Sequence, residues 1–594
     1  MTDLSDLVET PEDERDPRSD RVRHAGAPAE TADVPAAPTR AGDVPHMKWW
    51  GWGVPGVAFH FEDKPAFAPF VAEAVGLDLH AVAPLDPPRF EGLQVPASRD
   101  DGRVRAAAAA IVGDDAVRDD AMDRVVHTYG KSLRDLVRVR AGVLPRTPDL
   151  VVYPGTEDEV QALVAALVGL DAVLIPFGGG SNIAGSLEPD PAESRVVVSV
   201  DLGRLDRLID IDVASGLARI QAGALGPVLE AQLNERGWTI GHFPDSFTHS
   251  TLGGWVATRS SGMQSDKYGD IADIARGMRV ARPGGLLDVR PYPSASTGPS
   301  VRELILGSEG RLGVITEVTV QVHRVPAKRV IHAYFFPNWS AGLAAMQAIA
   351  ASDVHPTVTR VSDARETGFS LATAKESKGL SALAQKGLMA FLKRRGWDLD
   401  ELCLSFIGYE GEPDHVGRQR KAVERIVRRH GGIGVGTGPG VLYDQKKFDT
   451  PYLRDFLLDR GTAGDVSETA APWSRLRPVY DRAIAAAEEA YAALGRQGWI
   501  MCHLSHSYHA GACLYFTFAF VFGDDPVGEY DLVKTAVQQA FADAGGSLSH
   551  HHGVGLEHAA WLPDAVSAEG VGVLRGLFAA TDPGANLNPA KIVR

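Results

Sequence analysis

The sequence predicts an α+β fold of more than one domain, and two observations carry this prediction. From Pro145 onward, short β-branched runs alternate with amphipathic helical patterns, as in domains that mix helices and strands. Between residues 145 and 325, three polar segments rich in glycine and hydroxyl side chains interrupt this alternation. A chain of 594 residues is long enough for several domains of this kind.

The composition excludes several classes of protein. The chain has 60 Lys and Arg against 76 Asp and Glu, a net charge of −16, whereas a general nucleic-acid binder has a basic excess. Its 3 cysteines include no CxxC pair and fit a reducing compartment. No apolar run approaches the ~18 residues of a spanning helix, and no secretory signal is evident. We therefore expect a cytoplasmic protein without a nucleic-acid partner.

The N-terminal region divides into two parts. Residues 1–46 predict a disordered acidic extension, because they are rich in Asp, Glu, Arg, Pro and Ala and contain few large apolar side chains. Met47 is an alternative start. Residues 47–144 predict a helical lead-in, within which we expect the aromatic segment KWWGWG, residues 48–53, to pack against another domain.

The first glycine-rich segment is PFGGGSN, residues 176–182. A strand predicted over 172–176 leads into it, after a helix over 156–169 that begins with a capping box of Thr156 and Glu159. Successive N–H groups in such a loop can hold an anion, so a pyrophosphate is the natural guest. Taken alone, the motif also fits a tight turn that needs glycine only for its geometry.

Two further segments complete the set. Residues 241–271 cluster hydroxyl and glycine side chains without helical or strand periodicity, and we predict a polar loop there. Residues 305–322, ILGSEGRLGVITEVTVQV, lead into a strand over 314–322. Three such segments in one domain are harder to explain as turns. The elements predicted between them are strands over 195–200, 209–213 and 217–221 and a helix over 227–236.

A second domain is expected over residues 326–549, opened by the apolar run VIHAYFFPNW. Residues 381–395 predict a basic amphipathic helix, for which packing on this domain is favoured over contact with a membrane. GVGTGPG, residues 434–440, predicts a mobile loop rather than a nucleotide-binding turn, since Pro439 and the polar DQKKFD follow its glycines. We assign it no function.

One tyrosine stands out in a predicted strand over 513–521. Its alternation places four large apolar residues on one face, and Tyr515 on the other among Cys513, Thr517 and Ala519. A single large polar side chain among small ones indicates that Tyr515 faces a cavity. A core tyrosine with a satisfied hydroxyl is the alternative.

The segment SLSHHHGVG contains three consecutive histidines, His550, His551 and His552. On an extended backbone they alternate faces and cannot all meet one metal ion, so we predict no metal site. Imidazoles suit proton transfer or anion binding near pH 7. A surface cluster without function is the alternative.

PFGGGSN, PDSFTHSTLGGW and LGSEGRLGVIT resemble, in this order and spacing, the FAD-binding domain of the vanillyl-alcohol oxidase type over about residues 145–325. The resemblance implies a two-subdomain FAD-binding domain, an α/β cap domain over 326–549, and a C-terminal segment, 550–594, that returns over the flavin. PFGGGSN lacks the histidine of members with covalent FAD, so dissociable FAD is expected. The cofactor-binding residues that it implies are Pro176, Phe177, Gly178, Gly179, Gly180, Ser181, Asn182, Asp245, Ser246, Ser250, Thr251, Thr258, Arg259, Ser260, Ser261, Glu309, Gly310, Leu312, Gly313, Val314 and Ile315.

KWWGWG, PDSFTHSTLGGW, SETAAPWSRL, YHAGACLYFTFAF and SLSHHHGVG together resemble the alkyldihydroxyacetonephosphate synthase (alkylglycerone-phosphate synthase) family, from about Lys48 to the C-terminus. The resemblance implies that a flavin N5 adduct lets a fatty alcohol replace the fatty acid of acyl-dihydroxyacetone phosphate, without net redox change, in ether lipid synthesis. It assigns proton transfer to Tyr515, an essential role to the three histidines, and substrate binding to Arg360 and Arg454. Lipid substrates, a homodimer and peripheral membrane contact are the expected partners.

The alternative function is an FAD-linked D-2-hydroxyacid dehydrogenase of the lactate or glycolate type, which shares the C-terminal pattern seen here as DPGANLNPAK, residues 582–591. Those enzymes resemble one another in GHxGDGNxH and EHGxG patterns whose His and Glu residues hold a metal or substrate. In this chain Tyr515 replaces the last histidine of the first pattern and His551 replaces the glutamate of the second. This departure disfavours hydroxyacid oxidation. A flavin-binding protein without activity would leave both residues unexplained.

Overall fold

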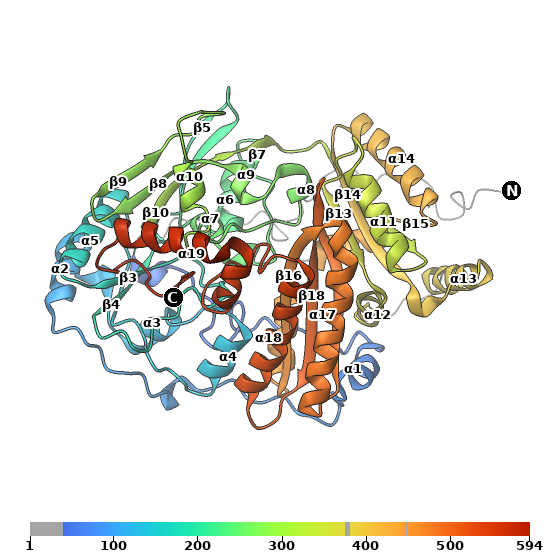
Figure 1. The fold of residues 1–594 in the computed structure, drawn as a ribbon, viewed down its shortest axis with the longest axis horizontal. Helices are drawn as coiled ribbons and strands as arrows, with labels where there is room; N and C mark the ends of the chain where they lie inside the picture. The colour runs from blue at the N-terminus through green and yellow to red at the C-terminus, as the bar shows by residue number, and fades with distance from the viewer. Residues whose placement is uncertain (1–39, 375–379, 447, 449, 594) are drawn as a thin grey trace.

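The computed structural model describes residues 40–374, 380–446, 448 and 450–593. Most of the extension predicted for residues 1–46 lies outside this range. Strands of the described chain form sheets of four, five, two and seven strands. The four- and five-stranded sheets lie in one half of the molecule and the seven-stranded sheet in the other, and α19 (Leu562–Thr581) crosses back over the first half (Figure 1).

The four-stranded sheet leads into the first glycine segment. Its order is β1 (Val117–Arg118), β2 (Leu150–Val152), β4 (Val197–Asp201), β3 (Val173–Phe177), with β2, β4 and β3 parallel. The helix α5 (Glu157–Gly169) buries its apolar face, as its period predicts. Thr156 caps it by accepting the Glu159 N–H, whereas the Glu159 carboxylate accepts the Gly155 N–H, one residue earlier than a capping box requires.

The five-stranded sheet is antiparallel and carries the third glycine segment at one strand end. The predicted strands over 209–213, 217–221 and 314–322 are confirmed to within one residue. Its order is β5 (Leu208–Asp212), β6 (Leu217–Gln221), β10 (Val314–Gln321), β8 (Ala275–Arg282), β9 (Gly285–Val289). This part of the chain also contains α6 (Gly226–Asn234), α10 (Val301–Ile305) and a separate two-stranded sheet of β7 (Trp238–Thr239) and β11 (His323–Arg324).

The loop predicted over 241–271 is wrong in part, because this segment contains short helices. They are η5 (Phe247–His249), α7 (Leu252–Thr258), α8 (Ser265–Tyr268) and α9 (Ile271–Ile274). The Thr251 hydroxyl caps α7 by accepting the Gly254 N–H, and Leu252, Trp255 and Val256 are buried. Helices of 3 to 7 residues are too short to display a helical period, so only the caps could have revealed them.

The seven-stranded sheet is antiparallel throughout and forms the second domain. Its order is β15 (Ile433–Gly436), β12 (Lys328–Phe336), β14 (Cys403–Gly411), β13 (Val358–Ser362), β17 (Gly498–Ser507), β18 (Gly511–Val521), β16 (Thr462–Pro472). One face packs in a common core with α11 (Trp339–Ala350), α14 (Pro413–Arg429), α17 (Trp473–Leu494) and α18 (Pro526–Ala544). The remaining helices of this domain are α12 (Ala364–Ala372), α13 (Leu380–Arg394), α15 (Gly438–Lys446) and α16 (Thr450–Leu458).

Two predictions for this domain have opposite outcomes. The amphipathic helix is confirmed as α13, whose Leu388, Phe391 and Leu392 pack with sheet residues. The mobile loop over 434–440 is wrong, since β15 pairs with β12 at the sheet edge and α15 follows directly. Proline in a first helical turn is compatible with a helix start, because its missing N–H has no intrahelical partner there.

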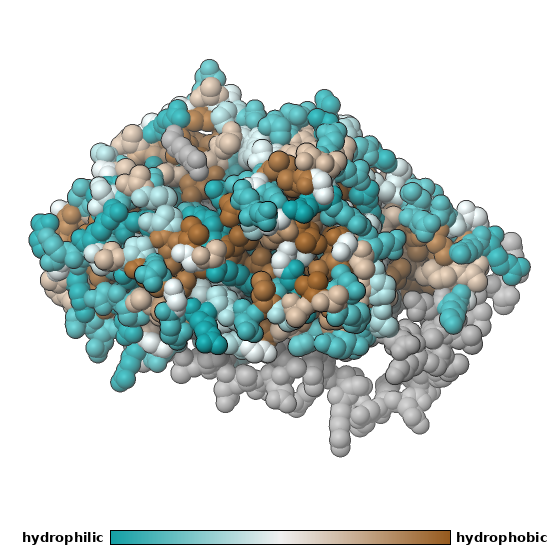
Figure 2. Space-filling model, turned by 90° about the horizontal axis from the view of Figure 1, so that it is seen from below, coloured by the Kyte–Doolittle hydropathy of each residue, from teal (hydrophilic) through white to brown (hydrophobic). Residues whose placement is uncertain are grey.

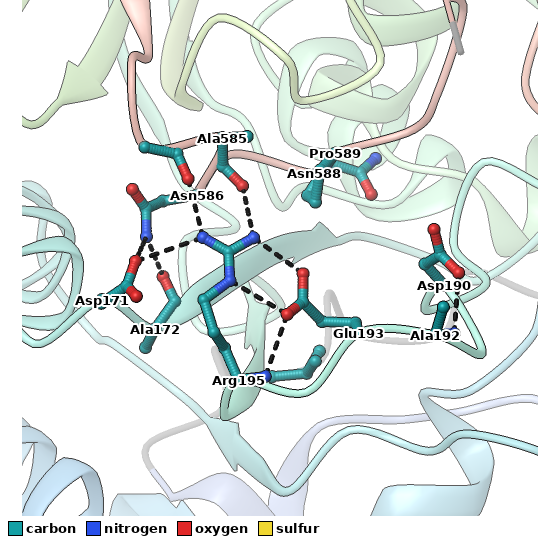
Figure 3. Close-up of polar contacts among 12 residues, drawn as sticks. Asp171, Ala172, Asp190, Ala192, Glu193, Arg195, Ala585, Asn586, Asn588 and Pro589 are labelled. Carbon is teal, nitrogen blue, oxygen red and sulfur yellow. Dashed lines mark hydrogen bonds and ion pairs between the residues drawn. The ribbon is translucent and has the colours of Figure 1, made fainter.

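The lead-in contacts the second domain, and the last described segment contacts the first half of the molecule. The lead-in contains α1 (Phe67–Val75), α2 (Arg103–Val112), α3 (Ala121–Val126) and α4 (Leu133–Arg140). Trp49 packs on α3 and α4, and the Trp52 N–H bonds Asp455 of α16. At the other end, Leu587 pairs with Leu174 of β3, and the Arg195 guanidinium donates to the carbonyls of Gly584 and Ala585 (Figure 3).

The surface is mixed in character. Seen from below, hydrophilic side chains dominate both ends of the molecule and apolar ones gather near the middle (Figure 2). Among the described helices, none is long and apolar enough to cross a membrane.

Candidate functional site

The first glycine segment is pressed against the second. A Cβ on Gly178 would lie 2.3 Å from the Thr251 hydroxyl, and one on Gly179 would lie 1.8 Å from the carbonyl oxygen of His249. The backbones therefore approach more closely than any residue with a side chain permits. This contact joins the end of β3 to the start of α7.

The same loop has hydrogen-bond donors to spare. In the described chain, no protein group accepts a hydrogen bond from the backbone N–H groups of residues 178–182. Buried or half-buried N–H groups usually have partners, so a run of free donors indicates a ligand with several acceptors. The phosphate oxygens of a dinucleotide such as FAD fit this donor set.

The third segment is tied to the C-terminal return. The Glu309 carboxylate accepts the backbone N–H groups of Val554 and Gly555 at 2.6 and 2.9 Å and the Ser186 hydroxyl at 2.8 Å. A Cβ on Gly310 would lie 3.0 Å from Pro176. The glycine segments and the stretch after the three histidines thus meet at one place, while Glu309 itself is fully used by protein donors.

Several of the residues implied for FAD binding already form hydrogen bonds or ion pairs within the protein. The Trp255 indole donates to the Ser250 hydroxyl, the Thr258 hydroxyl donates to a carbonyl of its own helix, and Ser260 bonds His242. Arg259 pairs with Glu303 near the surface. Their contribution to a cofactor would therefore come from the remaining lone pairs and from the backbone. Leu312, Val314 and Ile315 lie in the apolar core.

Tyr515 lies between two imidazoles on the sheet face opposite the buried phenylalanines of β18. Its ring stacks on His503 at 5.0 Å and 24° and on His551 at 6.0 Å and 12°, with the edge of His552 at 5.8 Å. Burial, reinforced by the negative charges of Asp245 and Glu468, raises the pKa of Tyr515 well above its usual value. The phenol is therefore protonated at neutral pH.

The three histidines are organised by one carboxylate. Glu468 of β16 accepts the backbone N–H groups of His550, His551 and His552 at 2.6, 3.1 and 3.1 Å. This segment bends around Glu468 and is not extended, so strict alternation of faces is wrong here: the Nδ1 atoms of His550 and His551 lie 2.8 Å apart. Burial lowers the pKa of His551 to about 3 and that of His552 to about 4, so both imidazoles are neutral.

A metal-like grouping exists at this place. Among the described residues, ligand atoms of Glu468, Cys513, His550 and His551 lie within 4.8 Å of one another. The Glu468 carboxylate, however, already accepts three backbone N–H groups and the Ser549 hydroxyl. A saturated carboxylate is a poor metal ligand, and the absence of a metal stays a prediction.

The two arginines predicted to bind substrate have different surroundings. Arg360 of β13 donates to Glu366 at 2.6 Å and lies 3.2 Å from His503 Nδ1. Arg454 of α16 donates only to the Lys131 carbonyl, at 2.5 Å, and its buried Nε and Nη2 have no partner among the described residues. The Lys131 N–H in turn donates to the Asn182 carbonyl, so Arg454 lies beside the first glycine segment.

Two members of the site escaped prediction from the sequence. His503 of β17 stands opposite Tyr515 in the strand register, and its Nδ1 lies 2.9 Å from Glu366 of α12. Neither residue falls in a recognisable motif. Alternation along β17 could have placed His503 on one face, but only strand pairing brings it to Tyr515.

Family models match two parts of the chain. Residues 148–289 match the FAD binding domain, and residues 325–592 match the FAD linked oxidases, C-terminal domain. These families identify FAD as the cofactor, consistent with the free donors of the first glycine segment. The N-terminal lead-in precedes both matched regions.

Relatives and solved structures resemble most of the chain. An alkyldihydroxyacetonephosphate synthase of Dictyostelium discoideum is 41% identical, covering 81% of this chain and 79% of that protein, and one of Trypanosoma brucei brucei is 35% identical, with the same coverage. A solved alkyldihydroxyacetonephosphate synthase superposes with a TM-score of 0.81 at 36% identity, covering 92% of this chain and 99% of that one.

A more distant structure defines only the fold. p-Cresol methylhydroxylase superposes with a TM-score of 0.62 at 15% identity, covering 86% of this chain and 99% of that one. The predicted FAD-binding domain with an α/β cap is therefore confirmed. The chain belongs to the alkyldihydroxyacetonephosphate synthase family of FAD-dependent enzymes.

Proposed function

We propose that this protein exchanges the acyl chain of acyl-dihydroxyacetone phosphate for a fatty alcohol. The alcohol oxygen becomes the ether oxygen, the fatty acid leaves with both of its oxygens, and the alcohol proton ends on the products, so atoms balance without oxidant or reductant. The observation that carries this proposal is a neutral phenol, Tyr515, held between neutral imidazoles of His503 and His551. Such a site can give and take protons without a change of oxidation state.

The cofactor site uses backbone more than side chains. The free N–H groups of residues 178–182 would hold the pyrophosphate, with the residues implied by the family resemblance around it. When bound, FAD supplies a nucleophilic ring nitrogen without net change of its oxidation state. The segment PFGGGSN contains no histidine for covalent attachment, which supports dissociable FAD.

Tyr515 and the histidines would carry out the proton transfers of the reaction. Because its raised pKa keeps the phenol protonated, Tyr515 donates to the departing fatty acid. Burial lowers the pKa of His551 and His552, so both imidazoles are neutral and each has a bare ring nitrogen that can receive the proton of the alcohol. Glu468 holds the backbone of all three histidines in place.

Arg454 is the better candidate for the phosphate of the substrate. Among the described residues, two buried nitrogens of Arg454, Nε and Nη2, have no partner, whereas only Nε of Arg360 has none and its charge is paired with Glu366. A phosphate would satisfy both free donors of Arg454 with charge-assisted hydrogen bonds. Arg360 would then shape the site beside His503 and Tyr515.

Membrane contact and dimerisation belong to the same proposal. The apolar side of α13 packs on the sheet through Leu392, while Lys393, Arg394 and Arg395 are exposed. An exposed basic stretch suits anionic lipid headgroups. Binding of α13 charge-reversal variants to anionic vesicles would test this contact, and sedimentation would test the homodimer.

A paired assay tests the main proposal. Flavin-loaded protein receives acyl-dihydroxyacetone phosphate with a labelled fatty alcohol in one arm and a panel of 2-hydroxy acids with a redox dye in the other. Labelled ether without dye reduction supports the exchange reaction. Dye reduction without ether would replace it by the D-2-hydroxyacid dehydrogenase alternative.

A further inference from the structure

A continuous series of hydrogen bonds runs toward Tyr515 from outside the predicted site. The Tyr508 hydroxyl donates to Asp270 Oδ2 at 2.8 Å, and the Tyr508 oxygen lies 2.5 Å from His550 Nε2. His550 Nδ1 lies 2.8 Å from His551 Nδ1, and the His551 ring stacks on Tyr515. Tyr508 begins the segment YHAGACLYFTFAF and Asp270 lies near the end of segment 241–271, but neither is among the predicted site residues.

Only one assignment of donor and acceptor is consistent with every hydrogen bond in this series. An ionised carboxylate can only accept hydrogen bonds, so the single hydroxyl hydrogen of Tyr508 is donated to Asp270. The Tyr508 oxygen must then accept a hydrogen bond from His550 Nε2–H. A neutral His550 then has a bare Nδ1, which must accept from His551 Nδ1–H. A neutral His551 is thereby left with a bare Nε2. Burial supports neutrality, since it lowers the pKa of both histidines.

We propose that Asp270 and Tyr508 are positioning residues that fix the tautomers of His550 and His551, so that His551 Nε2 is the proton acceptor of the site. This inference rests on the proposed function and deepens it. The alcohol proton passes to His551 Nε2 as the ether C–O bond forms, and Tyr515 protonates the departing carboxylate. Transfer from the imidazolium to the tyrosinate then restores both residues.

The other titratable groups beside His550 and His551 do not favour different tautomers of these histidines. His506 lies 5.0 Å from the His550 ring, but its Nε2 lies 3.0 Å from the Gly262 carbonyl and its Nδ1 lies 2.8 Å from the Ser505 hydroxyl. Glu468 lies 3.8 Å from His551 Nδ1, on the side that the proposed tautomer protonates. An acceptor there favours hydrogen at Nδ1 and stabilises the imidazolium formed during transfer.

The test is a double-mutant cycle on flavin-loaded protein with acyl-dihydroxyacetone phosphate and a labelled fatty alcohol. Tyr508→Phe keeps the ring beside His550 and removes only the hydroxyl. Partners that orient reacting imidazoles typically contribute ~10- to 100-fold, so kcat is expected to fall by that factor with KM and flavin content unchanged. Asp270→Asn, whose amide permits either direction of the series, is expected to lower kcat as well.

Non-additivity separates positioning from structural damage. Once the hydroxyl is absent, no hydrogen bond connects Asp270 to His550 through Tyr508, so the double variant is expected to have nearly the kcat of Tyr508→Phe alone. Tyr480→Phe is the matched control, because its hydroxyl also donates to a buried aspartate, Asp363, at 3.0 Å but on α17. Wild-type kcat in Tyr508→Phe, or fully additive losses, would overturn the inference, whereas absence of ether synthesis in the wild type would overturn the proposed function instead.

Discussion

Gly179→Ala offers a quantitative test of the FAD site. The new Cβ would lie 1.8 Å from the His249 carbonyl oxygen, whereas ordinary contact begins at 3.4 Å. The two segments must therefore separate by 3.4 − 1.8 = 1.6 Å, and because the blocking atom belongs to the backbone, no side-chain rotation can relieve it. Overpacking of this kind costs ~1–3 kcal/mol, which corresponds to a rise of roughly 5- to 140-fold in the Kd for FAD.

The assay is titration of FAD-free protein with FAD, followed through the change in flavin fluorescence. Gly178→Ala should have a smaller effect, since its Cβ would meet the Thr251 side chain rather than backbone. Gly169→Ala is the control, because a Cβ there meets nothing within 4 Å. A Kd for Gly179→Ala within twofold of the wild-type value, in protein that melts at the wild-type temperature, would refute the assignment.

Three further predictions concern chemistry and stability. Tyr515→Phe should lower kcat by roughly 10²- to 10⁴-fold at unchanged flavin content, and near-normal turnover would contradict its proton-transfer role. Arg454→Gln should raise the KM for the phosphate-bearing substrate about tenfold or more, with the KM for the alcohol unchanged; equal rises in both would mean that its role is structural. Burial lowers the pKa of His46, but the Asp201 carboxylate, at 2.8 Å, outweighs burial and raises this pKa above 6.5. The stabilisation of the fold by His46 is therefore complete below pH 6.5 and is lost as the pH rises through the folded-state pKa. Denaturant unfolding of wild type and His46→Gln should therefore differ more at pH 5.5 than at pH 8.5, and an equal difference at both would count against the pairing.

The elements that were predictable from sequence are those long enough to show a period. The helix α5 and the strands β6, β10 and β18 repeat their apolar positions often enough to be recognised. The helices α7 to α9 are shorter than two turns and depend on caps and tertiary packing. The strand and helix at 433–446 were hidden by glycine and proline, which here start a helix rather than a loop.

The site divides in the same way. Tyr515 was predictable because alternation along one strand isolates it, and the histidines because they are consecutive. His503 and Glu366 come from other elements and reach Tyr515 only through pairing of β13, β17 and β18. Tyr508 and Asp270 are separated by 238 residues, and no local pattern specifies their contact. Sequence reasoning thus finds reacting groups more readily than the groups that orient them.

The central claim is exchange without net redox change, and anaerobic turnover tests it most directly. Flavin-loaded protein would be mixed, without dye or oxygen, with excess acyl-dihydroxyacetone phosphate and a labelled fatty alcohol, and labelled ether and free fatty acid would be counted per flavin. Many equivalents of both products in equal amounts, with the flavin still oxidised at the end, are predicted. Product that stops at or below one equivalent, or that needs an added electron acceptor, would contradict the claim.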